Sequence, residues 1–326
     1  MKFNPLARLG RLIVALPLAI GALTAAAAPY PAKPVRIVVP AGAGSNPDLI
    51  ARIYAQKLSE LYGQSFYVEN KPGAGGSIGL AYASKLAPDG YSLVIGALGN
   101  LAINPSVYTR LPYDAQRDFA PVAQLVKSPL VLAAAKTSSI HTLADLIEQA
   151  KAKPTKLTFS SGGNGTGQHL SGEYLNTSAG ITLTHIPFSS TPASIVGVAG
   201  GEIDIVFGNQ AGVWPLVQSG KLTALAVTSD TRLSRYPDTP TMDETLKGFE
   251  IYDWSGFLVP AGTPLEIVQD LHAKLMKIQE MPDVRNQLEA SGFIIVESTR
   301  DEFRDFIANE RRKWGGIAKQ VGIKLD

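Results

Sequence analysis

The chain has 326 residues, of which 45% are hydrophobic and 18% charged. That is enough apolar content to fill the cores of two domains, and too little charge for a disordered protein. The absence of cysteine excludes disulfide scaffolds, thiolate nucleophiles, cysteine-ligated zinc and iron–sulfur clusters. The formal net charge of +2 owes its sign to the first residues of the chain.

Residues 1–28 have the parts of a secretory signal. Lys2, Arg8 and Arg11 form a basic segment, and the apolar run at 12–28 ends in four alanines. The alternative is a retained membrane anchor, but this run is broken by proline and glycine and is shorter than the about 20 residues that a span needs. We therefore expect cleavage after Ala28 and an exported, soluble mature protein.

Removal of this segment changes the charge balance. Of the 30 basic residues 27 remain, against 28 acidic residues, so the net charge becomes −1. No basic block or aromatic-interleaved patch is left, and nucleic acid is therefore not an expected partner.

Strand and helix patterns alternate from residue 35 onward. β-Branched runs predict strands, while apolar residues at helical spacing predict helices. In the first part we expect strands at 35–40, 65–69 and 91–97, and helices at about 47–62 and 77–86. In the middle we expect strands at 130–134, 157–160, 182–186, 203–207 and 223–227, and helices at about 142–152, 167–178, 192–199 and 211–219.

A proline-rich, polar connection at 230–240 precedes the last elements. We expect these to be a strand at 252–259, helices at about 264–279 and 282–290, a strand at 293–296 and an amphipathic helix from 301. Such alternation predicts an α/β fold with two lobes, each a mainly parallel sheet flanked by helices. Because chain termini tend to share a lobe, we expect lobe one at 29–128 plus 248–326 and lobe two at 129–247.

Five loops at expected strand ends are small and polar. They are residues 40–48, 97–105, 160–169, 187–193 and 207–211. Ligands of open α/β sheets bind beyond the carboxyl ends of strands, where glycines allow close approach and helix N-termini favour anions. None of the five loops contains Lys or Arg, so they suit one or two carboxylates better than a polyphosphate.

Ten residues of these loops are the expected ligand-binding residues. They are Gly44, Ser45, Asn46, Asp48, Asn100, Thr166, His169, Ser189, Ser190 and Asn209. Each has a structural alternative, because Gly, Ser and Asn build turns and Asp48 complements a helix dipole. His169 and Glu173 share a helix face, but two such side chains without a third do not make a metal site. We expect no metal and no cofactor.

Catalytic motifs are nearly absent. The glycines at 42–44 and 73–75 lack the third glycine of a dinucleotide-binding loop. Residues 75–79 match G-x-S-x-G, which would make Ser77 the nucleophile of an exported hydrolase, but no HGGG-type oxyanion loop accompanies them. We expect no enzyme, with a serine hydrolase using Ser77 as the alternative.

Short motifs follow one another along almost the whole chain. They are YPAKPVRIVVP (30–40), DLIAR (48–52), VENKPGAGG (68–76), APDGY (87–91), AINP (102–105), LPYD (111–114), DFAP (118–121), SGGNGT (161–166), HL (169–170), GKL (220–222), AVTS (226–229) and PAGTP (260–264). In this order and spacing the chain resembles the Bug family of extracytoplasmic solute-binding proteins, the receptors of tripartite tricarboxylate transporters.

The resemblance implies two α/β lobes that close on a ligand like a Venus flytrap. It implies a periplasmic protein that holds a carboxylate through backbone amides, hydroxyls and water, and that delivers it to membrane permease subunits. We expect a monomer. A ligand-sensing subunit of a signalling system would share the same fold and site, so it stays open as a further alternative.

Three loops depart from the usual family pattern. The first keeps one glycine and inserts Ser45, residues 188–191 have Phe-Ser-Ser-Thr in place of aromatic-Lys-Gly, and Gly208 replaces an aspartate before Asn209. Relative to the usual pattern, residues 188–191 lack the lysine cation and gain hydroxyl groups, and Gly208 leaves more room in the cleft. We expect a di- or tricarboxylate, and these changes favour a bulkier carboxylate, with aromatic acids among the candidates, over an amino acid or a small dicarboxylate.

Overall fold

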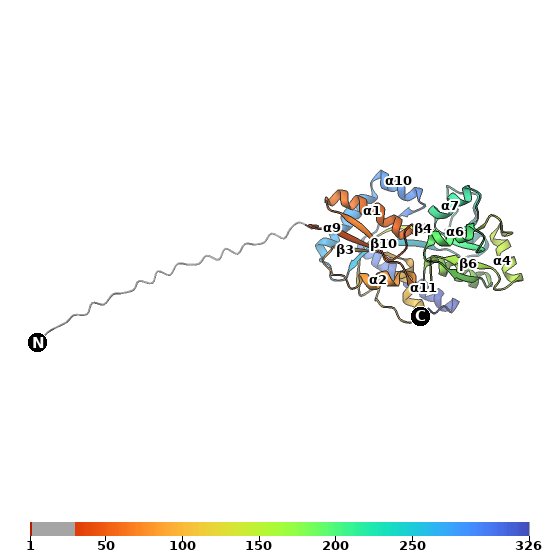
Figure 1. Ribbon diagram of the computed structural model, residues 1–326, viewed down its shortest axis with the longest axis horizontal. Coiled ribbons are helices and arrows are strands. Elements are labelled where there is room, and N and C mark those ends of the chain that lie inside the picture. The colour runs from red at the N-terminus through yellow and green to blue at the C-terminus, as the bar shows by residue number, and fades with distance from the viewer. Residues whose placement is uncertain (2–29, 326) are drawn as a thin grey trace.

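Two β-sheets, each covered by helices, make up the protein (Figure 1). The computed structural model describes Met1 and residues 30–325. Apart from Met1, the predicted signal segment at 1–28 and its cleavage site lie outside the described residues. None of the described helices is long and apolar enough to cross a membrane.

Sheet one has six strands, in the spatial order β11-β4-β10-β3-β1-β2. Their bounds are β1 Val35–Val39, β2 Phe66–Asn70, β3 Ser92–Ala97, β4 Phe119–Pro129, β10 Tyr252–Pro260 and β11 Ile294–Ile295. β1 pairs in parallel with β2 and β3, whereas β10 is antiparallel to both β3 and β4, and β11 is antiparallel to β4.

Sheet two has five strands, in the order β7-β6-β8-β5-β9. Their bounds are β5 Val131–Ala135, β6 Thr158–Ser161, β7 Thr184–Pro187, β8 Ile205–Gly208 and β9 Leu222–Val227. β6 pairs in parallel with β7 and β8, and β5 is antiparallel to β8 and β9.

Most strands of each sheet run in one direction, as the prediction of mainly parallel sheets has it, but β10 and β11 in sheet one and β5 in sheet two run the opposite way, so both sheets are mixed. The physical reason is the way the chain passes between them. β4 leaves sheet one at the end facing sheet two, so the strand that returns, β10, must enter at that end and run the opposite way. β5 likewise enters sheet two from the end toward which β6 and β8 run.

The chain crosses between the sheets twice, first at Leu130 and again between β9 and β10. Hydrogen bonds tie the crossings together: the Thr228 amide donates to the Leu130 carbonyl at 3.0 Å, and the Ile251 amide donates to the Thr228 carbonyl at 2.9 Å. The proposed lobe boundaries near residues 128 and 248 lie close to these crossings.

Helices pack on both faces of each sheet (Figure 1). Around sheet one lie α1 (Asn46–Tyr62), α2 (Ser77–Ala83), α9 (Leu265–Gln279), α10 (Pro282–Ala290) and α11 (Arg300–Val321). With sheet two go α4 (Leu143–Ala152), α5 (Gly167–Ala179), α6 (Thr191–Ala199) and α7 (Gln210–Gln218). Short turns complete the list: η1 (Ala74–Gly76), η2 (Gly99–Ile103), α3 (Asn104–Val107) and α8 (Met242–Thr245).

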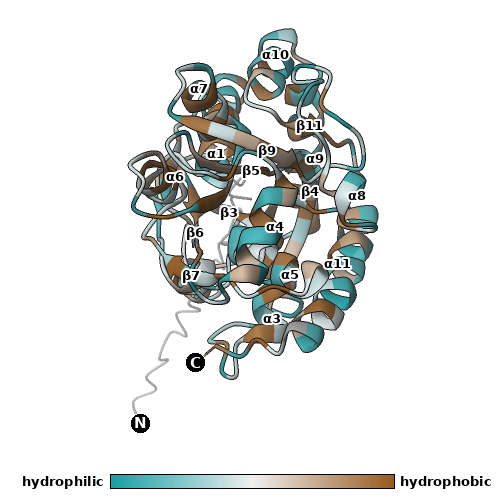
Figure 2. Ribbon diagram, turned by 90° about the vertical axis from the view of Figure 1, so that its right-hand side faces the viewer, coloured by the Kyte–Doolittle hydropathy of each residue, from teal (hydrophilic) through white to brown (hydrophobic). Residues whose placement is uncertain are grey.

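Apolar side chains fill the space between sheets and helices, and the outer faces of α4, α10 and α11 are largely hydrophilic (Figure 2). One buried cluster extends from Val94 of sheet one to Phe159 of sheet two. Trp254 and Trp314 belong to it, and both donate an indole N–H to Glu310 of α11. The two sheets therefore share part of their core along α11.

Candidate ligand-binding cavity between the sheets

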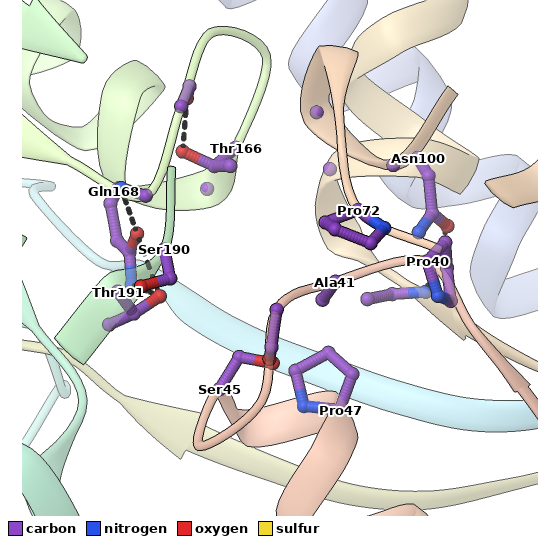
Figure 3. A pocket seen from close by; sticks show the side chains of 18 of the residues that line it. Pro40, Ala41, Ser45, Pro47, Pro72, Asn100, Thr166, Gln168, Ser190 and Thr191 are labelled. Carbon is purple, nitrogen blue, oxygen red and sulfur yellow. Dashed lines mark hydrogen bonds between the residues drawn. The ribbon is translucent and has the colours of Figure 1, made fainter. Parts of the chain in front are cut away.

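A cavity of about 160 Å³ lies between the two sheets, where loops at the carboxyl ends of their strands face each other. Figure 3 shows Thr166, Gln168 and Ser190 on one side of it and Pro72 and Asn100 on the other. The lining residues are Pro40, Ala41, Gly42, Ser45, Pro47, 72–76, Ala97, Gly99, Asn100, Gly162, Gly163, 166–168, 188–191 and Asp253. The site therefore takes residues from both sides of the crossings.

Three helices direct their N-termini at the cavity. Ser45 and Pro47 at the start of α1, 166–168 at the start of α5, and 190–191 at the start of α6 all line it. Unpaired amides at helix N-termini carry partial positive charge and bind anions. Together they can hold a carboxylate although no described lining residue is Lys or Arg.

Asp48 organises the loop before α1 rather than lining the cavity. Its carboxylate accepts hydrogen bonds from the Gly44 amide (2.9 Å), from Asn70 Nδ2 (2.9 Å) and from Arg52 Nε (3.0 Å). Burial raises the pKa of Asp48, but these hydrogen bonds outweigh it and hold that pKa below its usual value. Gly44 has a φ of +76°, a conformation that glycine adopts without strain.

The loop before α5 is held by side chains of the helix itself. The Thr166 hydroxyl accepts from the His169 amide at 3.3 Å and donates to the Gly163 carbonyl at 2.8 Å. Gln168 accepts from the Gly162 amide at 2.9 Å and donates to the Thr191 hydroxyl at 3.0 Å. Gln168 thus links the starts of α5 and α6 across the cavity wall.

Half of the ten predicted site residues line the cavity. They are Ser45, Asn100, Thr166, Ser189 and Ser190. The other five lie behind the lining: Gly44, Asn46, Asp48, His169 and Asn209. Of these, Asn46 accepts from Asn209 Nδ2 at 3.0 Å, a hydrogen bond that joins the two sides of the cavity. Their contact with a ligand stays a prediction.

The buried His169 and the half-buried His185 form a stacked pair, with ring centroids 4.0 Å apart. Burial lowers the pKa of His169 to about 4 and, with the neighbouring His169, that of His185 to about 3, so both are neutral near pH 7. His185 Nε2 lies 2.7 Å from the Ser161 hydroxyl, and the Gly165 amide donates to His169 Nδ1. Within the described part of the chain, no three potential metal ligands gather at one point.

Ser77 lies at the start of α2 and is buried. Its hydroxyl accepts from Asn104 Nδ2 at 3.1 Å, and none of the hydrogen bonds in the described residues joins it to a histidine. The arrangement lacks the base that a serine nucleophile needs.

Three polar side chains line the cavity without being among the ten predicted site residues: Gln168, Thr191 and Asp253. Gln168 stands in a predicted helix start beside Thr166, where its position alone could have suggested it. Asp253 is a charged residue inside the apolar pattern of β10, and that mismatch is the signal by which it could have been found. Burial raises the pKa of Asp253 to about 6, against the opposing effect of a hydrogen bond from Asn46.

Comparison with known proteins identifies the family. Residues 50–323 match the tripartite tricarboxylate transporter family receptor, TctC. The chain belongs to this family. It is 32% identical to Protein BugT of Bordetella pertussis (strain Tohama I / ATCC BAA-589 / NCTC 13251) over 298 residues, which cover 91% of each chain. The predicted resemblance to the Bug family is confirmed.

Solved structures show the same fold. A structure of R. palustris Rpa4515 with adipate superposes with a TM-score of 0.87 at 31% identity, covering 90% of this chain and 99% of that one. Periplasmic binding protein BugD gives 0.86 at 30% identity, covering 91% and 100%. MatC of Rhodopseudomonas palustris with bound malate gives 0.84 at 28% identity, covering 88% and 99%. The two-lobe α/β fold is confirmed.

Proposed function

We propose that this protein is a periplasmic receptor that captures a small carboxylate in the cavity between its lobes and delivers it to the permease subunits of a tripartite transporter. The observation that carries the proposal is the convergence of three helix N-termini on a cavity whose described lining has no Lys or Arg. Amides and hydroxyls there can solvate an anion in place of water. Adipate and malate in two structures of the family support the ligand class.

The walls of the cavity are compatible with more than one carbon skeleton in the ligand. Its apolar lining includes three prolines and three alanines. The Phe188 ring packs against α6, since a Cβ at Gly197 would lie 2.7 Å from it. An aliphatic diacid and the aromatic acid favoured by the loop sequences therefore belong in the same screen.

The test is a thermal-shift screen followed by calorimetric titration. The screen compares succinate, malate, adipate, citrate and benzoate. A ligand at a hundredfold excess over its Kd should add about 2.7 kcal/mol to the free energy of unfolding. If no organic acid stabilises the protein, the receptor proposal is wrong. Delivery is tested separately by uptake of the radiolabelled acid in cells with and without the gene.

Ser189→Ala is the matched variant, because the Ser189 side chain is exposed and lines the cavity. Loss of a hydrogen bond to a charged ligand should weaken binding by about 1.5–3 kcal/mol, with the unfolding midpoint of the free protein unchanged. Ser138→Ala, at a position outside the lining, is the control and should leave the affinity for the ligand unchanged. Unchanged affinity in Ser189→Ala would remove this loop from the site.

A further inference from the structure

Asp253 is the one ionisable side chain among the described residues that line the cavity. It is the second residue of β10, paired with Ser128 of β4, and so lies at the base of the cavity beside the crossings. A Cβ at Gly167 would lie 3.7 Å from Asp253 Oδ1, so this oxygen faces the start of α5. The carboxylate thus occupies the same space as the converging helix N-termini.

The protein leaves this carboxylate short of partners. Oδ2 accepts a hydrogen bond from Asn46 Nδ2 at 3.3 Å, and the Trp254 amide contributes a backbone interaction. Asn46 is itself held by Asn209. Among the described ion pairs, none includes Asp253. A half-buried carboxylate with so few donors is costly unless something else donates to it.

A second negative charge also conflicts with an anion-binding cavity. The ligand carboxylate and Asp253 would repel each other at short range within a cavity of about 160 Å³. The conflict disappears when the ligand presents a hydrogen-bond donor to Asp253 and its carboxylate to the helix N-termini. The pKa of about 6 leaves Asp253 mostly ionised near neutral pH, and so able to accept.

We propose that Asp253 selects the ligand, by accepting a hydrogen bond from a hydroxyl or ammonium group that the carboxylate ligand carries. This inference rests on the proposed function and narrows it: the receptor prefers a hydroxy- or amino-substituted acid to the unsubstituted acid. Both a hydroxyl and an ammonium group can donate this hydrogen bond. Ligands that share a carbon skeleton and differ only in that group distinguish the two.

The test measures ratios of Kd by calorimetry near neutral pH. Two sets of three acids are used, and the acids of one set share a carbon skeleton. The first trio is succinate, malate and aspartate, and the second is propionate, lactate and alanine. The wild type should bind a substituted member about tenfold or more tightly than the unsubstituted one, as expected for a hydrogen bond to a charged group. Preference for malate or lactate identifies the hydroxyl, and preference for aspartate or alanine the ammonium.

Asp253→Asn and Asp253→Ala should abolish this ratio, and both should bind succinate more tightly than the wild type does, since the repulsion is gone. Asp253→Asn keeps the shape of the side chain, so it still gives a result if Asp253→Ala fails to fold. Ser45→Ala is the matched control: it lies in the lining and should weaken all members of a trio alike, leaving the ratio unchanged.

Two outcomes overturn the inference while the receptor function stands. In the first, the ratio of Kd between unsubstituted and substituted acids is the same in the Asp253 variants as in the wild type. The other is a preference for the unsubstituted acid that Asp253→Asn weakens, which would make Asp253 a donor to the ligand. No binding by any acid of the trios or of the screen overturns the receptor function and this inference together.

Discussion

Individual residues around the cavity divide into those that line it and those that hold the lining in place. Asp48 fixes the Gly44 amide, and Asn46 joins Asn209 to Asp253. His169 holds the Gly165 amide. The holding residues Asp48, Asn46, Asn209 and His169 are buried and bonded to the chain itself, so their substitution should change stability first and ligand binding as a consequence.

The stacked histidine pair makes stability depend on pH. His169 has a pKa of about 4 in the folded protein against 6.5 for an unburied histidine. Between these values the unfolded chain binds more protons, so stability falls as the pH drops below about 6.5 and the loss is complete near pH 4. For His169 alone the loss should be about 3 kcal/mol.

Urea unfolding across this pH range measures the effect. His169→Gln should flatten the decline in the free energy of unfolding. His185 keeps the part of its lowered pKa that burial causes, whereas the part caused by His169 is lost in His169→Gln. An unchanged slope in His169→Gln would show that the histidine does not titrate differently on unfolding.

At the scale of elements, the helix starts are where sequence and structure agree most closely. Thr166 and Ser190 each precede a helix and cap it with a side-chain oxygen, and Asn209 does so for α7. Such caps, together with apolar periodicity, are local in sequence, which is why the polar loops at strand ends could be placed in advance.

The cap of α5 gives a prediction at this scale. Thr166→Ala removes the acceptor for the His169 amide and the donor to the Gly163 carbonyl, so it should lower the free energy of unfolding by about 1 kcal/mol and weaken ligand binding. Thr166→Ser keeps the hydroxyl and is the control. Denaturation and calorimetry check both effects, and equal stability of the Ala and Ser variants would contradict the capping role.

Elements that depend on distant partners could not be predicted from local pattern. β4 was missed because prolines interrupt its apolar run, and its main partner, β10, lies more than a hundred residues later. The direction of β10 depends on where the chain crosses between sheets. The charge of Asp253 in an apolar strand is a local signal, but its place in the cavity depends on that crossing and not on local pattern. Where a loop is expected at 97–105, Gly99–Ile103 and Asn104–Val107 form helical turns.

For the molecule as a whole, the two sides of the cavity are in contact. A Cβ at Gly42 would lie 3.0 Å from the Ser190 Cβ, and one at Gly75 would lie 2.5 Å from the Asn164 carbonyl oxygen. With the hydrogen bond from Asn209 to Asn46, these contacts describe a closed arrangement. Closure removes water from the ligand and strengthens each hydrogen bond that it makes.

Gly99 tests whether binding requires this closed state. A Cβ at Gly99 would lie 2.9 Å from the Gly165 carbonyl oxygen on the opposite side, although the Gly99 backbone itself accepts alanine without strain. Gly99→Ala should therefore hold the sides apart and weaken binding by about 1–3 kcal/mol, the usual cost of overpacking. Small-angle scattering should show a larger radius of gyration in the presence of ligand than for the wild type.

Gly316→Ala in α11 is the matched control, because a Cβ there meets nothing within 4 Å. It should stabilise the free protein by about 0.5–1 kcal/mol through the helix preference of alanine and leave the Kd unchanged. If Gly99→Ala bound ligand as tightly as Gly316→Ala, contact between Gly99 and Gly165 would not be required for binding. A lower affinity confined to Gly99→Ala would instead tie capture of the ligand to closure of the whole molecule.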